Sequence, residues 1–167
     1  DRSPSRGLGD VYKRQVDNMA NWFNEEVAAD WMEDRQKMMT ILQEEAELNE
    51  IVQMVGMDAL SPTDRLKMEA ARSIREDFLH QNSFHEIDTY TPLRKQYLMM
   101  KLVLAFYEKS VDALNKGADM NALIAMPVRE KIGRYKYTTD ADIESEYKNV
   151  EEELDKEVAA AFGKEDF

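Results

Sequence analysis

The sequence has 167 residues, the length of one ordinary domain, and its 43% hydrophobic content is enough to form a core. Six glycines and four prolines are few beside the many Leu, Met, Ala, Glu and Lys residues, which favours helices because unbranched side chains lose little freedom there. A formal charge of −12 argues against nucleic acid or anionic lipid as a partner, since both require clustered Lys and Arg. The absence of cysteine excludes disulfides and thiolate metal sites. We predict an all-α helical bundle.

The first residues differ in composition from the rest of the chain. Residues 1–15 read "DRSPSRGLGDVYKRQ", where Pro, Gly, Ser and Arg cluster and no helical period can be drawn. "DVYKRQ" resembles a translated DNA-sequencing adaptor, and an ordinary N-terminal tail is the alternative. We therefore expect a non-native or disordered leader at 1–15 and one helical domain at 16–167.

Apolar residues recur at spacings of three and four through the next segment. This pattern predicts two helices between residues 16 and 50, with a break near residues 28–30. The second helix should end at Gly56, because glycine tolerates the left-handed conformation of a helix C-terminus. The apolar positions are Met19, Trp22, Phe23, Val27, Trp31, Met38, Met39, Ile41, Leu42 and Leu48.

A helix start follows at Ser61. The Ser61 hydroxyl can cap free backbone N–H groups, Pro62 fits the first turn, and Asp64 lies near the positive end of the helix dipole. This helix should end near His80. On its outer face we expect ion pairs four residues apart, Arg65 with Glu69 and Arg72 with Glu76.

A second Thr–Pro helix start, at residues 91 and 92, opens the longest apolar pattern in the chain. The pattern predicts a helix over about 92–116 that closes at Gly117. Because its apolar residues cover much of the circumference, we expect this helix at the centre of the bundle. Its eleven-residue apolar run at 97–107 is shorter than the roughly 20 residues of a spanning helix and contains Lys101, so we expect a soluble, cytoplasmic protein.

The last third of the sequence predicts shorter helices and then one long one. Pro127 and Gly133 punctuate residues 121–137, where we expect one or two short helices. Thr139 and Asp142 form a candidate capping box. A final amphipathic helix should bury Ile143, Tyr147, Val150, Leu154, Val158 and Phe162.

No residue pattern indicates catalysis or a metal site. The two histidines, His80 and His85, are five apart across a loop, whereas a helical metal pair needs a spacing of three or four. The Gly-rich phosphate loops and the serine-nucleophile motif are missing from these residues. We therefore expect no metal and no catalytic residue within this segment.

Long stretches of the sequence resemble the C-terminal helical domain of the catalytic A subunit of V-type and A-type ATPases. They include "NMANWFNEEVAADWMEDR", "LNEIVQMVGMDALSPTDRLKMEAARSIREDFLHQNSFHEIDTYT" and "MPVREKIGRYKY", and the likeness runs from about Val16 to the C-terminus. The resemblance implies a fragment that lacks the β-barrel and P-loop domains. It also implies a rotary enzyme that couples ATP hydrolysis or synthesis to proton or sodium transport, with ATP/ADP and Mg held mainly by the missing P-loop domain.

The same resemblance implies partners and a location. The subunit would alternate with B subunits in an A3B3 ring around a central stalk subunit, peripheral on the cytoplasmic face and touching the membrane only indirectly. "QNSF" places Phe84 where the family carries an aromatic residue that contacts adenine. From the pattern alone, the alternative is that Phe84 fills a gap between helices, since buried aromatic residues usually belong to the core.

The segment "DALSPTDR" is similar to the family's helix–turn–helix tip that contacts the rotor stalk. The residues carried over to that contact are Asp58, Leu60, Ser61, Pro62, Thr63 and Asp64. Few of them are acidic, so such a contact would depend more on shape than on charge. Without the resemblance, the segment reads as an ordinary exposed turn.

Two other functional classes are alternatives to a rotary ATPase subunit. A free-standing acidic helical adaptor that binds a protein through Met-rich faces is compatible with 11 methionines. A carboxylate metalloenzyme bundle does not fit, because paired Glu-x-x-His motifs are missing. The upstream coding sequence would separate the ATPase from the adaptor: a P-loop reading frame continuous with Val16 favours the first, and a start codon near Met19 the second.

Overall fold

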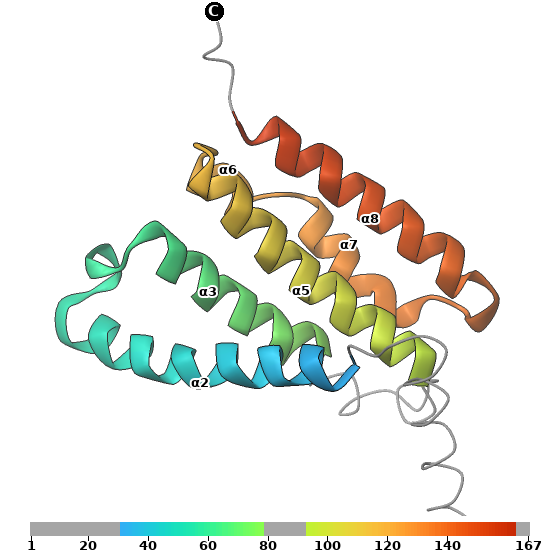
Figure 1. The fold of residues 1–167 in the computed structure, drawn as a ribbon, viewed down its shortest axis with the longest axis horizontal. Helices are drawn as coiled ribbons and strands as arrows, with labels where there is room; N and C mark the ends of the chain where they lie inside the picture. The colour runs from blue at the N-terminus through green and yellow to red at the C-terminus, as the bar shows by residue number, and fades with distance from the viewer. Residues whose placement is uncertain (1–30, 79–92, 163–167) are drawn as a thin grey trace, which may run out of the picture.

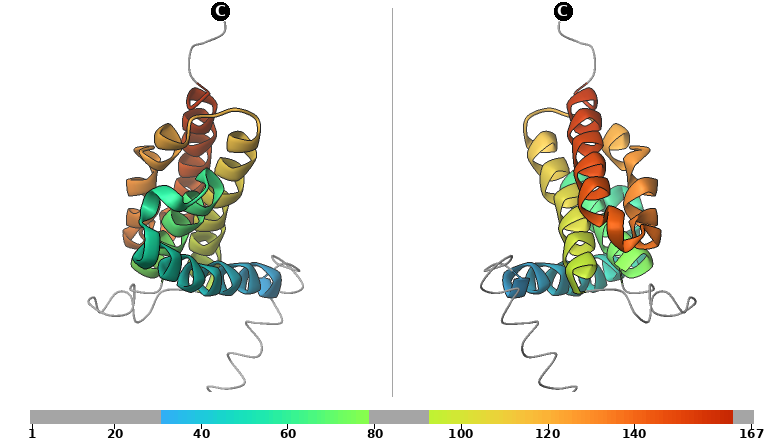
Figure 2. Two further views of the ribbon diagram at one scale, coloured as in Figure 1. Left: turned by 90° about the vertical axis from the view of Figure 1, so that its left-hand side faces the viewer. Right: turned by 90° about the vertical axis from the view of Figure 1, so that its right-hand side faces the viewer.

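A computed structural model describes residues 31–78 and 93–162, and the chain in these ranges is helical, without strands. Helices α3, α5 and α8 run side by side, α7 packs against α8 and α5, and α2 crosses one end of the bundle (Figures 1 and 2). The all-α prediction is confirmed. The α-helices are α2 (Trp31–Val55), α3 (Pro62–Ser73), α5 (Leu93–Asn115), α6 (Met120–Ile124), α7 (Val128–Arg134) and α8 (Ile143–Ala160).

Helices α2 and α3 form an antiparallel pair with a tight connection. α2 ends at Gly56, whose φ of +90° lies in the left-handed region, as predicted. A single 3-10 turn, η2 (Met57–Ala59), follows. The Ser61 hydroxyl then accepts a hydrogen bond from the Asp64 N–H at 3.1 Å, which confirms the predicted cap of α3. The predicted break at residues 28–30 lies outside the described residues.

α3 continues into a π-helical turn, η3 (Ile74–Phe78). The predicted pair of Arg72 with Glu76 is wrong: Arg72 contacts Glu69 at 2.9 Å instead. Spacings of three and four are both close on a helix, and Glu69 is already held in place by Arg129 of α7. Arg65 forms no ion pair with another residue of the described ranges. The predicted end near His80 lies beyond those ranges.

Helix α5 is the central element, as predicted. It packs against α2, α3, α7 and α8, and most of its circumference is buried. It ends at Asn115, followed by Gly117 with φ of +106°. The buried α5 side chains include Tyr97, Leu98, Met99, Met100, Leu102, Val103, Leu104 and Phe106.

The last third contains the expected short helices and long final helix, with two corrections. Gly133 does not end a helix but lies within α7. Because it has no side chain, Asp77 of the π-helical turn η3 can lie close to its backbone. Thr139 does not form the predicted capping box: its hydroxyl donates to the Asp142 carboxylate at 2.9 Å, and a 3-10 turn, η6 (Asp140–Asp142), precedes α8. The predicted apolar face of α8 is confirmed, with Ile143, Val150 and Leu154 buried and Tyr147, Val158 and Phe162 packed against the core.

Candidate functional site

The turn between α2 and α3 contains the six residues that resemble a stalk-contacting tip. It lies at one edge of the molecule, at the far left of Figure 1. Asp58, Ser61 and Pro62 are exposed, and Thr63 and Asp64 are half-buried. Leu60 differs from the others because only 8% of it is exposed. Five of the six residues therefore offer surface to a partner, while Leu60 anchors the turn to the core.

The backbone of this turn is held by its own hydrogen bonds. The Ala59 N–H donates to the Gly56 carbonyl at 3.3 Å, and the Leu60 N–H donates to the Met57 carbonyl at 3.1 Å. The Arg65 N–H donates to the Ser61 carbonyl at 3.0 Å. Together with the Ser61 cap, these bonds satisfy groups that would otherwise need water. These hydrogen bonds favour a single conformation of the turn.

Exposed apolar residues surround the start of this turn. They are Ile51, Met54, Val55 and Met57, at the end of α2 and in η2. Sequence reasoning missed them as surface residues, because apolar side chains near a helix end are usually assigned to the core. The available signal was the run "IVQMVGM", which continues past the helix-ending glycine and is too apolar for a solvated connection.

Phe84, the predicted adenine contact, lies outside the described residues, and so do both histidines. The described chain stops at Phe78, at the end of η3, and resumes at Leu93. Within the described ranges, no group of three or more acidic or histidine side chains could hold a metal ion. None of the helices in these ranges is both long and apolar enough to cross a membrane.

A polar junction around Arg129 ties the other end of α3 to the bundle. Its guanidinium donates to the Glu69 carboxylate at 2.8 Å, to the Ser73 hydroxyl at 2.9 Å and to the Ile124 carbonyl at 2.9 Å. It also donates to the Glu69 carbonyl at 3.2 Å and lies 4.5 Å from the centre of the Phe106 ring. One largely buried cation thus connects α3, α5, α6 and α7.

Asp77, on the π-turn next to this junction, has an unusual environment. The pKa of its carboxyl is raised from 3.8 to about 6, mainly by burial and to a smaller extent by the nearby Glu76. Lys136, Arg129 and Arg72 oppose the rise in this pKa. The Asp77 carboxylate faces the backbone at Gly133, where an added Cβ would lie only 2.8 Å from one of its oxygens. The group therefore changes charge near neutral pH at a tight helix contact.

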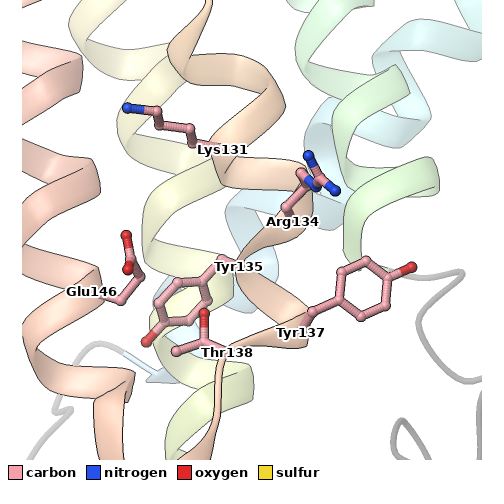
Figure 3. Close-up of a pocket in the computed structure, with 6 residues that line it drawn as sticks. All are labelled: Lys131, Arg134, Tyr135, Tyr137, Thr138 and Glu146. Carbon is pink, nitrogen blue, oxygen red and sulfur yellow. The ribbon is translucent and has the colours of Figure 1, made fainter.

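A cavity of about 490 Å³ lies between α8 and the segment formed by α7 and the following 3-10 turn, η5 (Tyr135–Tyr137). Figure 3 shows Glu146 on the α8 side and Arg134 and Tyr137 extending toward the opposite side. Lys131 pairs with Glu153 of α8 at 3.1 Å, and the Tyr135 hydroxyl donates to the Ile143 carbonyl at 2.6 Å. These two polar groups of the cavity wall therefore already have partners within the fold.

Comparison with known proteins identifies the family. The model of the family described as "C-terminal domain of V and A type ATP synthase" matches residues 20–124. The chain belongs to this family. The match includes the α2–α3 turn, α5 and Phe84, whereas Arg129, Gly133 and the cavity lie beyond it.

Individual relatives extend the similarity over most of the chain. The V-type ATP synthase alpha chain of Acetivibrio thermocellus is 52% identical over 154 residues, 92% of this chain and 26% of that protein. V-type ATP synthase alpha chain 1 of Clostridium tetani is 50% identical over 88% of this chain and 25% of its own length. The V-type ATP synthase alpha chain of Clostridioides difficile is 50% identical over 89% of this chain and 25% of its own length. The chain therefore spans about a quarter of the length of the relatives it matches.

Proposed function

We propose that this chain is the C-terminal helical part of a V/A-type ATP synthase alpha (A) subunit. In the complete subunit it would serve a rotary complex that couples ATP hydrolysis or synthesis to proton or sodium transport. The identity of 52% over 92% of the chain to a V-type ATP synthase alpha chain supports this proposal. ATP or ADP with Mg would be held mainly by a P-loop domain upstream, in an A3B3 ring with B subunits on the cytoplasmic face of the membrane.

Within that complex, the α2–α3 turn is proposed to contact the central stalk. The observation that supports this role is a projecting turn whose backbone is hydrogen-bonded within itself and whose Asp58, Ser61 and Pro62 face outward. A stiff, exposed turn suits a contact that must transmit force. The chain alone is expected to hydrolyse no ATP, because its sequence contains no P-loop motif.

The stalk contact can be tested by photo-crosslinking, because this chain contains no cysteine. Asp58→Cys, placed in the complete complex after other accessible cysteines have been replaced, would be labelled with a benzophenone maleimide. Illumination should join the subunit to the stalk and stop ATP turnover. Lys116→Cys, at an exposed position after α5, is the matched control. Absence of a stalk product from position 58, or equal products from both positions, would contradict the proposed contact.

The proposed adenine contact of Phe84 depends on the resemblance of "QNSF" alone. Removing an aromatic ring that stacks on a base costs about 1–3 kcal/mol, so Phe84→Ala in the complete enzyme should raise the KM for ATP about fivefold or more. Phe84→Tyr should preserve the KM, since its ring can still stack. An unchanged KM for ATP in Phe84→Ala would contradict the adenine contact and favour a role of Phe84 in packing.

The proposed whole-subunit setting has a separate test in the gene. Intact genomic DNA from the same source should contain a P-loop reading frame continuous with Val16, and residues 1–15 should not be encoded there. A start codon near Met19 would instead favour the free-standing adaptor. The purified 167-residue chain provides a biochemical check. Measurable ATP turnover by this chain would contradict the proposal that ATP hydrolysis requires the upstream P-loop domain.

A further inference from the structure

Exposed apolar side chains gather at the end of α2 more than anywhere else in the described chain. The exposed fractions are 82% for Met54, 64% for Val55, 42% for Ile51 and 39% for Met57. These four, here called the apolar cap, account for most of the seven large apolar residues exposed in residues 31–78 and 93–162. Scattered single residues of this kind are normal, whereas four within seven positions mark an interaction surface.

The fold itself does not use the apolar cap. α2 packs on the bundle through earlier positions, including Met38, Ile41 and Leu48, which are buried. None of the four cap residues belongs to the hydrophobic core of the described chain, although Leu60, just after them, is buried. Leu60 is therefore not available as apolar surface at this tip, whereas the four residues of the apolar cap are exposed.

Acidic side chains border the apolar cap. Glu47 and Glu50 lie on the last turns of α2, and Asp58 lies in η2; all three are exposed. None of them forms an ion pair with another residue of the described ranges. A partner that covers the apolar cap would bring its own border close to these carboxylates, so Lys or Arg there would be favourable and Asp or Glu would be repelled.

Two of the four cap residues are methionines, and their flexibility favours a particular kind of occupant. Unbranched methionine side chains adapt to different partner shapes. Apolar contact is also non-directional, so it tolerates a partner that changes position. An amphipathic helix offers such an apolar surface, because binding through its apolar stripe is a recurring mode of protein recognition.

We propose that the apolar cap docks on an α-helix of the central stalk that carries an apolar stripe bordered by Lys and Arg. The inference rests on the proposed function for the identity of the partner. It adds the residues that make the contact and the chemistry of the surface that they recognise. It also moves the main contact from residues 58–64 back to residues 51–57.

Crosslinking from the apolar cap in the complete complex tests the inference. Met54→Cys, labelled with benzophenone maleimide, should react with a stalk helix, and the labelled peptide should carry apolar residues flanked by Lys or Arg. Met32→Cys is the matched control, because Met32 is also an exposed methionine of α2 (60%) but lies at the other end of the helix. We expect at least a fivefold higher yield of stalk product from position 54.

The outcomes separate this inference from the function on which it rests. Stalk product from position 58 without product from position 54 would overturn the inference and leave the proposed stalk contact standing. Absence of product from both positions would count against the stalk contact itself. Stalk product from position 54 on a peptide bordered by Asp and Glu would overturn the proposed partner chemistry.

A second pair of variants tests whether the apolar side chains themselves are needed. The double variant Met54→Ser, Val55→Ser should lower the stalk product formed from labelled Asp58→Cys at least threefold. Met32→Ser, Met39→Ser removes two exposed apolar side chains from the same helix and should leave that yield unchanged. Equal yields in the two double variants would overturn a contact role for the apolar cap.

Discussion

The two ends of α3 contrast in where their side chains find partners. At its start, next to the apolar cap, apolar and acidic side chains face outward and the fold makes little use of them. At its other end, Arg129 and Asp77 lie in a polar junction packed against α7. The contrast teaches that one helix pair can be anchored firmly at one end and remain available for binding at the other. Substitutions should therefore act on stability at the junction and on partner binding at the tip.

The largest effect on stability is expected at Arg129. Arg129→Met keeps an unbranched side chain but removes the donor to Ser73 and the more buried of the two donors to the Glu69 carboxylate, so the free energy of unfolding should fall by about 3 kcal/mol. Arg134→Met, in the same helix but with 74% of its side chain exposed, should change it by less than about 0.5 kcal/mol. Urea unfolding followed by circular dichroism measures both values. Similar losses in the two variants would remove the distinction between junction and surface.

The contact between Gly133 and Asp77 should have the next largest effect. Gly133→Ala would place a Cβ 2.8 Å from an Asp77 oxygen, and overpacking of this kind costs about 1–3 kcal/mol. Alanine also favours the helix by about 1 kcal/mol, so the net loss should be about 1 kcal/mol. In an Asp77→Ala background the same change should become neutral or stabilising. Equal effects of Gly133→Ala in both backgrounds would show that the two residues do not interact.

The features that sequence reasoning found are those set by neighbouring residues. Gly56, Ser61 and Gly117 were predicted correctly because a left-handed φ or a capping hydroxyl depends on only a few positions. The central place of α5 followed from an apolar circumference, which only several neighbours can bury.

Features that depend on distant parts of the chain could not be read in the same way. Gly133 was interpreted as a break because nothing in the sequence indicates that Asp77 lies beside it. Arg129 stands among other charged residues, and only the packing of α7 on α3 distinguishes it from them. Met38 and Met39 are adjacent, yet Met38 is 5% exposed and Met39 is 55% exposed. The spacing of apolar residues predicts a helix, but it does not show which of two adjacent apolar residues faces the rest of the fold.

The ionisation of Asp77 should produce a smaller, pH-dependent effect at the junction. Its pKa is raised from 3.8 to about 6 in the folded chain, so the folded state binds this proton more tightly than the unfolded state. Ionisation therefore costs stability above pH 6, and the cost disappears as the pH falls toward 4. Asp77→Asn should raise the free energy of unfolding at pH 7 by about 1 kcal/mol, allowing for solvent screening of a half-buried group.

The measurement is the difference in unfolding free energy between Asp77→Asn and the parent chain at several pH values from 4 to 8. Other carboxylates contribute equally to both proteins and cancel in this difference. Glu152→Gln, at an exposed position of α8, serves as the control for removing one negative charge. A difference that stays constant over this pH range would mean that Asp77 does not titrate there, and the junction would then be insensitive to pH.

The smallest effect on stability is expected at the apolar cap, and this sharpens the contrast most. Met54 is 82% exposed, so Met54→Ala should change the free energy of unfolding by less than about 0.5 kcal/mol. Leu48→Ala, six residues earlier on the buried side of α2, should lower it by about 2 kcal/mol or more. Thermal or urea unfolding distinguishes these values. If Met54→Ala cost as much as Leu48→Ala, Met54 would be part of the fold's own packing, and a partner helix could not use its side chain without weakening α2.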